Sequence, residues 1–165
     1  MKILGIDPGT TRVGFGVVEQ RGNKLIGHVY GCIRAEDCSS THGRLERIYK
    51  EIISLIERYR PDAVAVESLF FNSNAKTAFA VGEARGVILL AAAHCGVGVS
   101  EYTPLEVKQA ITGNGRAEKS QMQRMIQLLL SLPEAPLSDD AADALGIAVC
   151  HANSSRLREL VKLKR

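Results

Sequence analysis

The chain has 165 residues, of which 45% are hydrophobic and 24% charged, and its formal net charge is +3. These values are typical of one globular domain with its own core; they exclude a disordered chain, and the small charge alone does not argue for a nucleic-acid partner. No apolar run approaches the roughly 18 residues of a membrane span, no cleavable signal follows Met1 and no C-x-x-C motif is present, so a cytoplasmic protein with reduced cysteines is expected.

Apolar runs at 2–6, 13–19 and 24–34 predict three consecutive strands in the first part of the chain. Pro8-Gly9 turns the chain between the first two strands, and Asn23 marks a hairpin turn before the third. Strands joined by such short turns pair antiparallel.

Helices and strands alternate in the rest of the chain. The expected elements are a helix between caps at 39–41 and Pro61, a strand at 63–66, an alanine-rich helix from caps at 72–74 to about 93, a strand at 96–102, a short helix from Pro104, a helix through Met122 and Leu130, and a last helix at about 138–153. This order predicts an α/β domain over 1–153, a five-stranded mixed sheet flanked by helices. A basic tail at 154–165 follows, which is either solvated or in contact with phosphates.

One carboxylate, Asp7, directly follows the first predicted strand and has glycines two residues away on either side. Aspartate is common in turns, so Asp7 could serve only as a turn former. Glycines, however, leave room for something to approach the backbone closely, which a simple turn does not require. The pattern therefore favours a functional carboxylate.

Further acids occur where the predicted fold would bring them close to Asp7. Glu67 follows the strand at 63–66, and functional sites of open α/β sheets form at the C-terminal ends of strands. Asp140 and Asp143 are three residues apart in the last predicted helix and share one face of it. Compensation of the helix dipole would explain these two aspartates, but it does not explain two more acids at strand ends.

Four carboxylates in a partly desolvated pocket repel one another, so cations must offset their charge. Oxygen ligands without histidine or cysteine suit Mg²⁺, with Mn²⁺ as a substitute. Two such ions about 3.5–4 Å apart would serve the attacking water and the leaving oxygen in phosphodiester hydrolysis. The sequence therefore predicts a two-ion site on Asp7, Glu67, Asp140 and Asp143.

Several motifs carry a resemblance to a known family. In chain order they are G-I-D-P-G at 5–9, V-E at 66–67, G-E-A-R-G-V at 82–87, P-L-E-V-K at 104–108, A-E-K-S-Q at 117–121 and D-A-A-D-A-L at 140–145. Together they resemble the RuvC family of crossover junction endodeoxyribonucleases, to about Asn153. The resemblance implies a ribonuclease H-like fold and Mg²⁺-dependent, paired nicking of Holliday junctions by a homodimer, in recombination and repair. It also implies the branch-migration complex RuvA-RuvB as a partner.

The family's four acids correspond to Asp7, Glu67, Asp140 and Asp143. Asp139 is an additional neighbouring acid, so the third ligand could be Asp139 or Asp140, and the D-A-A-D spacing favours Asp140.

The resemblance also implies roles for basic residues. Lys108 and Lys119 correspond to catalytic lysines near the scissile phosphate; without the resemblance they would be solvated helix surface. Arg85 and Arg116 are expected to contact DNA phosphates.

Two adjacent aromatic residues, Phe70 and Phe71, follow Glu67 in a polar loop. Either could stack on an unpaired base, and either could pack in the core instead. The resemblance implies Phe70 as the residue that probes the junction, which leaves Phe71 as the candidate for inward packing. For the homodimer we expect an interface on the long helix around Gly82, Ala84, Gly86 and Val87, because small residues let helices approach closely.

Two other functions compete with the nuclease. The segment G-I-D-x-G-T-T at 5–11 also resembles the first phosphate loop of actin-like and sugar-kinase ATPases. Those enzymes close two lobes around ATP, and this chain has length for one lobe only. The other alternative is a DNA-structure-binding module without catalysis, for which four acids facing phosphates would be unfavourable.

Overall fold

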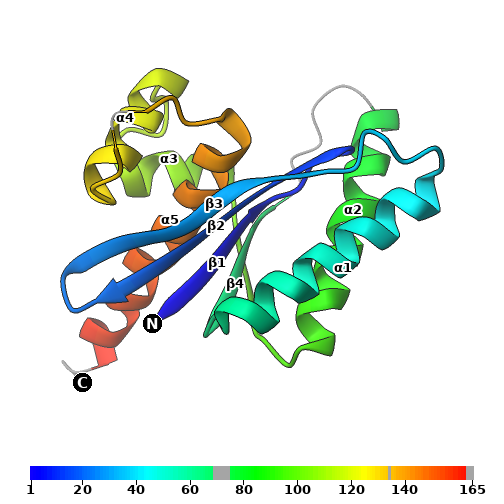
Figure 1. Ribbon diagram of the computed structural model, residues 1–165. Helices are drawn as coiled ribbons and strands as arrows, with labels where there is room; N and C mark the ends of the chain where they lie inside the picture. Colours follow the sequence, from blue (N-terminus) through cyan, green and yellow to red (C-terminus); the bar gives the residue numbers. More distant parts are fainter. Residues whose placement is uncertain (69–74, 134, 163–165) are drawn as a thin grey trace.

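A five-stranded mixed sheet forms the centre of the computed structural model, which describes residues 1–68, 75–133 and 135–162 (Figure 1). The strands are β1 (Lys2–Asp7), β2 (Arg12–Arg21), β3 (Lys24–Arg34), β4 (Ala63–Glu67) and β5 (Val99–Tyr102). Their order in the sheet is β3-β2-β1-β4-β5. β1 pairs antiparallel with β2 and parallel with β4, which confirms the predicted mixed sheet.

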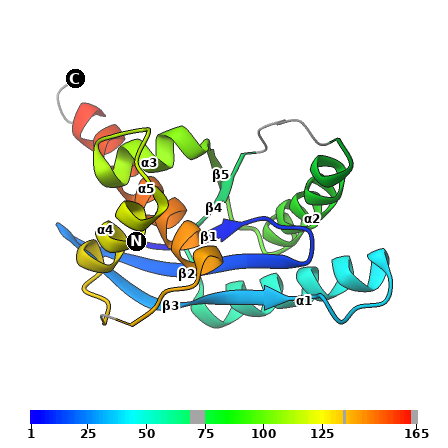
Figure 2. The same cartoon turned by 90° about the horizontal axis from the view of Figure 1, so that it is seen from above.

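Five helices cover the two faces of this sheet in the described part of the chain. They are α1 (Thr41–Tyr59), α2 (Ala75–His94), α3 (Pro104–Thr112), α4 (Lys119–Leu129) and α5 (Asp139–Lys162). Figures 1 and 2 show α1 and α2 on one side of the sheet and α3, α4 and α5 on the other. The apolar stripe of α1, Ile48, Ile52 and Ile56, is buried against the first face.

Glycines in β1 and β2 let α5 lie directly on the second face of the sheet. A Cβ atom on Gly14 would lie 2.0 Å from the backbone oxygen of Asp140, and one on Gly5 would lie 2.1 Å from that of Ala144. The alanines of α5 complete this close approach, since Ala141, Ala144 and their neighbours are buried. The first turn of α5 is therefore fixed against the part of β2 that pairs with the end of β1.

A capping box fixes the start of α3 at the end of β5. The Thr103 hydroxyl accepts a hydrogen bond from the Glu106 backbone N–H at 3.2 Å, and the Glu106 carboxylate accepts one from the Thr103 backbone N–H at 2.7 Å. Pro104 occupies the first turn, as predicted. These bonds fix the first turn of α3 and so the position of Lys108, which lies one turn further along the helix.

Two element boundaries differ from the prediction. β5 begins at Val99 rather than Gly96, because Gly96 has a φ of 68° and the N–H of Val97 still bonds back to the carbonyl of Ala92 at the end of α2. α5 runs on to Lys162 instead of ending near Asn153, since no glycine or proline interrupts that stretch. None of the helices in the described ranges has the length and apolar character needed to cross a membrane.

Candidate active site

The first predicted ligand, Asp7, is partly buried at the C-terminal end of β1. Its pKa is raised to about 7, chiefly because burial disfavours the charged form and further because of the charges of Glu67, Asp143 and Asp140. The Lys119 ammonium opposes this rise. All four predicted acids therefore share one electrostatic environment, although they come from three separate parts of the chain.

Glu67 ends the strand beside β1. Because Ile6 pairs with Val66 in the parallel ladder, Asp7 and Glu67 leave adjacent strands at the same edge of the sheet. Burial raises the pKa of Glu67, the charge of Asp143 raises it further, and Lys108 lowers it. The two acids on strands are thus neighbours because of backbone pairing alone.

A cavity of about 210 Å³ lies next to these acids. Its lining comes from the end of β4 and from α3, α4 and α5, and comprises Glu67, Pro104, Val107, Lys108, Lys119, Met122 and Asp143. Two predicted ligands and both predicted lysines therefore surround one hollow. Phosphate groups are attracted to lysines in such a position, next to acids that could hold cations.

The acids of α5 make ion pairs with side-chain cations. Asp140 Oδ2 accepts a hydrogen bond from Arg12 Nε at 2.9 Å and forms an ion pair with Arg12 Nη2 at 2.7 Å. Lys119 Nζ lies 3.6 Å from a carboxylate oxygen of Asp143 and 3.0 Å from one of Asp139. Burial raises the pKa of Asp143, and Lys119 opposes that shift.

Asp139 and Asp140 have different contacts in the structure. Asp139 accepts a hydrogen bond from Gln123 Nε2 at 2.7 Å and pairs with Lys119 on the α4 side. Asp140, in contrast, is among the charges that raise the pKa of Asp7. This placement favours Asp140 as the acid that belongs with Asp7.

The donor set of this site fits a hard divalent cation, because it consists of carboxylates whose mutual repulsion such an ion would relieve. Nevertheless, no three His, Cys, Asp or Glu side chains in the described residues are close enough together to hold an ion. On α5, Asp140 pairs with Arg12 and Asp143 with Lys119.

The other predicted residues have different positions. Arg85 pairs with Glu101 of β5, and its side chain is mostly buried, so it is not a free phosphate contact. Arg116 is exposed in the loop before α4. Phe70 and Phe71 lie outside the described residues.

Sequence reasoning missed Arg12 and Gly14. Arg12 is 128 positions away from Asp140, and only the fold brings the two together. Gly14 offered a signal, since a glycine within a strand often marks the close approach of another backbone. Asp140 indeed lies over it.

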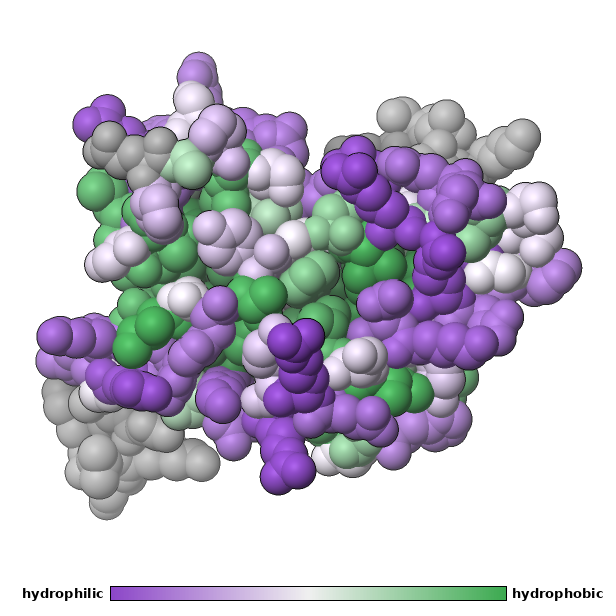
Figure 3. Space-filling model, viewed as in Figure 1, coloured by the Kyte–Doolittle hydropathy of each residue, from purple (hydrophilic) through white to green (hydrophobic). Residues whose placement is uncertain are grey.

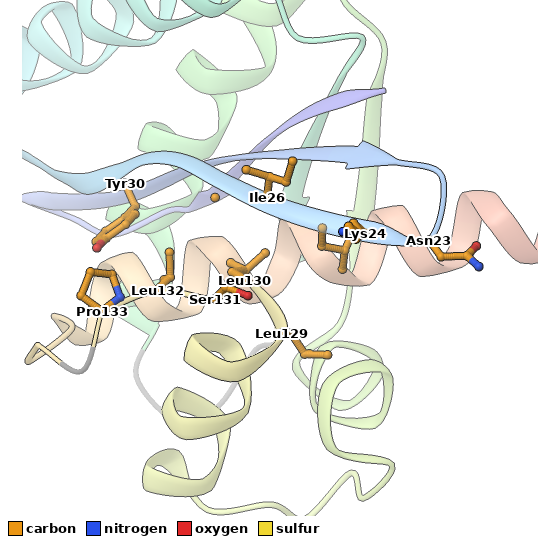
Figure 4. Close-up of a pocket in the computed structure, with 11 residues that line it drawn as sticks. Asn23, Lys24, Ile26, Tyr30, Leu129, Leu130, Ser131, Leu132 and Pro133 are labelled. Carbon is orange, nitrogen blue, oxygen red and sulfur yellow. The ribbon is translucent and has the colours of Figure 1, made fainter.

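A second cavity, of about 700 Å³, lies far from this chemistry, between β3 and the connection from α4 to α5 (Figure 4). Its lining includes Ile26, Tyr30, Leu130 and Leu132 but no acid. On the face of the molecule shown in Figure 3, polar residues gather over α1, and apolar residues are visible near the centre and left. This cavity has no groups for hydrolysis, so the acidic edge is the candidate site.

Comparison with known proteins agrees with the site. Residues 3–151 match the family model described as crossover junction endodeoxyribonuclease RuvC. The chain is 59% identical over 162 residues to the crossover junction endodeoxyribonuclease RuvC of Moorella thermoacetica, with 98% of this chain and 97% of the relative covered. The corresponding protein of Desulforamulus reducens is 55% identical, with 94% and 95% covered.

Solved structures agree as well. The structure of Thermus thermophilus RuvC in complex with a Holliday junction substrate superposes with a TM-score of 0.90 at 39% identity, covering 95% of this chain and 96% of that one. These matches confirm the predicted ribonuclease H-like fold and the predicted endonuclease over both competing functions. The chain therefore belongs to the RuvC family of crossover junction endodeoxyribonucleases.

Proposed function

We propose that this chain resolves Holliday junctions by Mg²⁺-dependent hydrolysis of one phosphodiester bond in each of two paired strands, with Mn²⁺ as a substitute metal and two ions per site. The observation that carries the proposal is the shared environment of Asp7, Glu67, Asp140 and Asp143, which raises the pKa of Asp7 to about 7. Family membership supports the reaction, and the relative from T. thermophilus was solved with a Holliday junction substrate.

The four acids would hold the ions, which when bound supply a means to deprotonate water and to stabilise the leaving oxygen. The rest of the chemistry comes from the chain itself. Lys108 and Lys119 line the hollow beside Glu67 and attract the phosphate to it. The strand ends fix Asp7 and Glu67 relative to each other, so the phosphate meets a pre-formed surface. Arg116 adds an exposed positive charge near the start of α4.

Phe70 follows Glu67 by three residues in the sequence, and we propose that it stacks on a base opened at the crossover. Unstacking costs a few kcal/mol per step, and an aromatic ring recovers about 1–3 kcal/mol per base. Phe70→Ala should therefore slow cleavage about tenfold or more on a paired junction and less on a junction with unpaired bases at the crossover. An equal defect on both substrates would reject this role, and a large loss of melting temperature would assign Phe70 to the core, where we place Phe71.

We further propose a homodimer that places two sites on the two equivalent strands of a junction. The outward face of α2 supports it: the side chains of Phe79 and Leu90 are 72% and 48% exposed, and Gly86 has open space around it. The expectation for Ala84 was wrong, because that residue is fully buried in the core. Sedimentation equilibrium should give a dimer that Leu90→Glu dissociates; a monomer at micromolar concentration would refute it.

RuvA-RuvB as a partner and a cytoplasmic location follow from the same function and remain proposals. The deciding experiment is incubation with a labelled four-way junction and with a matched linear duplex, each with and without Mg²⁺. We expect paired nicks in the junction only, and only with Mg²⁺. Cleavage of both substrates at equal rates, or cleavage in EDTA, would refute the proposed function.

A further inference from the structure

We propose that Arg12 is an exchangeable counter-ion for Asp140: its guanidinium holds the carboxylate while no divalent ion is bound, and turns to a DNA phosphate when an ion takes its place. The inference rests on the proposed function and adds a positioning residue to it. Its role is to couple two events, the binding of the ion and the binding of DNA.

The contact between Arg12 and Asp140 is close and one-sided. Nε donates a hydrogen bond of 2.9 Å to Oδ2, and Nη2 forms an ion pair with the same oxygen at 2.7 Å. Charge-assisted bonds of this kind are about twice as strong as neutral ones. Arg12 therefore sets the rotation of the carboxylate through a single oxygen.

Rigid backbone brings the two residues together. Arg12 is the first residue of β2, and Gly14, two residues later, has the backbone of Asp140 directly above it. Gly14 also pairs with Asp7 across the ladder. The backbone of Asp140 consequently lies close to β2, which carries Arg12, and to the end of β1, which carries Asp7. In the proposal the carboxylate turns between Arg12 and the other acids by rotation of its side chain alone.

The charges around Asp140 decide whether its carboxylate lies beside Arg12 or beside the other acids. The acids carry like charges that repel Asp140, whereas the Arg12 guanidinium attracts it at 2.7 Å, so without a cation Asp140 is more stable against Arg12. A divalent ion among the acids reverses this preference, because it attracts Asp140 and repels the guanidinium. The orientation of the Asp140 side chain thus depends on whether the ion is bound.

Once released, Arg12 is available to DNA. Its side chain is 43% exposed, and a second acid beside it, Glu36, is 3.6 Å away and itself 49% exposed. A pair of this kind contributes little and would not retain the guanidinium. A planar guanidinium binds a phosphate through two parallel hydrogen bonds, so the ion and the DNA backbone should each strengthen the binding of the other.

The first test measures binding of the ion alone. Free Mn²⁺ is followed by electron paramagnetic resonance while it is titrated into wild type, Arg12→Gln and Arg12→Lys. We expect Arg12→Gln to bind Mn²⁺ about tenfold more tightly, since a competing positive charge is gone, and Arg12→Lys to stay near wild type. Arg21→Gln is the matched control, because Arg21 forms a similar pair with Glu19 at the other end of β2. Unchanged or weaker Mn²⁺ binding by Arg12→Gln would overturn the inference.

The second test measures the transfer to phosphate. Fluorescence anisotropy gives the affinity for a four-way junction in EDTA and in Ca²⁺. Wild type should gain affinity with Ca²⁺, and Arg12→Gln should show a gain about threefold smaller, while both bind alike in EDTA. An equal gain in both proteins would overturn the inference and leave the proposed function intact. Wild type that neither binds Mn²⁺ nor cuts a junction would instead refute the proposed function itself.

Discussion

The acids on strands and the acids on α5 differ in what neutralises them. Asp7 and Glu67 are fixed by a parallel ladder, and within the described ranges no basic side chain lies within ion-pair distance of either. Asp140 and Asp143 are carried by a helix and pair with Arg12 and Lys119. Asp7 and Glu67, here called the strand pair, are therefore held rigidly and repel each other. The negative charges of Asp140 and Asp143, the helix pair, are instead compensated by basic side chains. In such a site the uncompensated repulsion lies between acids that the sheet holds in place. The acids on the helix can change partners by movement of side chains.

The largest effect is expected from substitutions that remove the charge of an acid in either pair. Asp7→Asn, Glu67→Gln and Asp143→Asn should each slow cleavage by at least about a thousandfold, equivalent to several kcal/mol, because each amide keeps the shape and loses the charge that holds a cation. Junction affinity should change little, since basic contacts to phosphate supply it. Nicking rates and gel-shift affinities are measured together, with Glu46→Gln, on the exposed face of α1, as the control. Near wild-type nicking by all three variants would refute the metal-site assignment.

A second change moves the helix pair away from the strand pair. Gly14→Ala places a Cβ 2.0 Å from the backbone oxygen of Asp140, so α5 must shift, and we expect a loss of about 2–3 kcal/mol in the free energy of unfolding together with a strong loss of nicking. Gly98→Ala meets nothing within 4 Å and is the matched control. Urea unfolding and nicking rates measure both effects. Equal behaviour of the two variants would show that the contact over Gly14 is not required.

The third prediction uses the raised pKa of Asp7, which results chiefly from burial and further from the charges of the neighbouring acids. The pKa of Asp7 is about 7 in the folded protein and about 4 in an unfolded chain, so the folded state binds more protons between these values. Stability without divalent ions should therefore fall as the pH rises from about 4 to 7. Asp7→Asn should be more stable than wild type by about 2–4 kcal/mol at pH 8, and equal to it near pH 4.

Thermal melts in EDTA at the two pH values provide the measurement. Added Mg²⁺ should raise the melting temperature of wild type and leave that of Asp7→Asn nearly unchanged. A variant less stable than wild type at pH 8 would show that burial and neighbouring charges do not destabilise the ionised form of Asp7.

The smallest expected effect distinguishes two adjacent acids of α5. Asp140→Asn should impair nicking severely, whereas Asp139→Asn should change it by only about threefold, because Asp139 forms an exposed pair with Lys119 and such pairs contribute little. Comparison of the two nicking rates at saturating Mg²⁺ decides the matter. The reverse order would assign the ligand to Asp139.

Much of this architecture was accessible from the sequence, because local signals and the chain order agreed. Short apolar runs predicted β1 and β4, and acids at their ends predicted the strand pair. Spacing placed Asp140 and Asp143 on one face of a helix. These features depend on periodicity, which the sequence states directly.

The partners of those acids were not accessible. Arg12 pairs with Asp140, which is far away in the sequence, and no local sequence pattern predicts such a contact. Ala84 was predicted to lie in the dimer interface because small residues favour close packing. The same property suits a core position, and Ala84 lies in the core. Arg85 is conspicuously basic in sequence, yet Glu101 of a neighbouring strand engages it. Each of these outcomes depends on tertiary contacts alone.

The close seating of α5 on β1 and β2 has a consequence for the order of events during synthesis. β1 leaves the ribosome well before α5, so the contacts between Gly5 and Ala144, and between Gly14 and Asp140, join elements that are far apart in the sequence. Contacts at such separation form late in folding, because a long loop must close first. An unfinished chain holds Asp7 and Glu67 but not the helix pair. Nuclease activity should therefore appear only when the whole domain has folded.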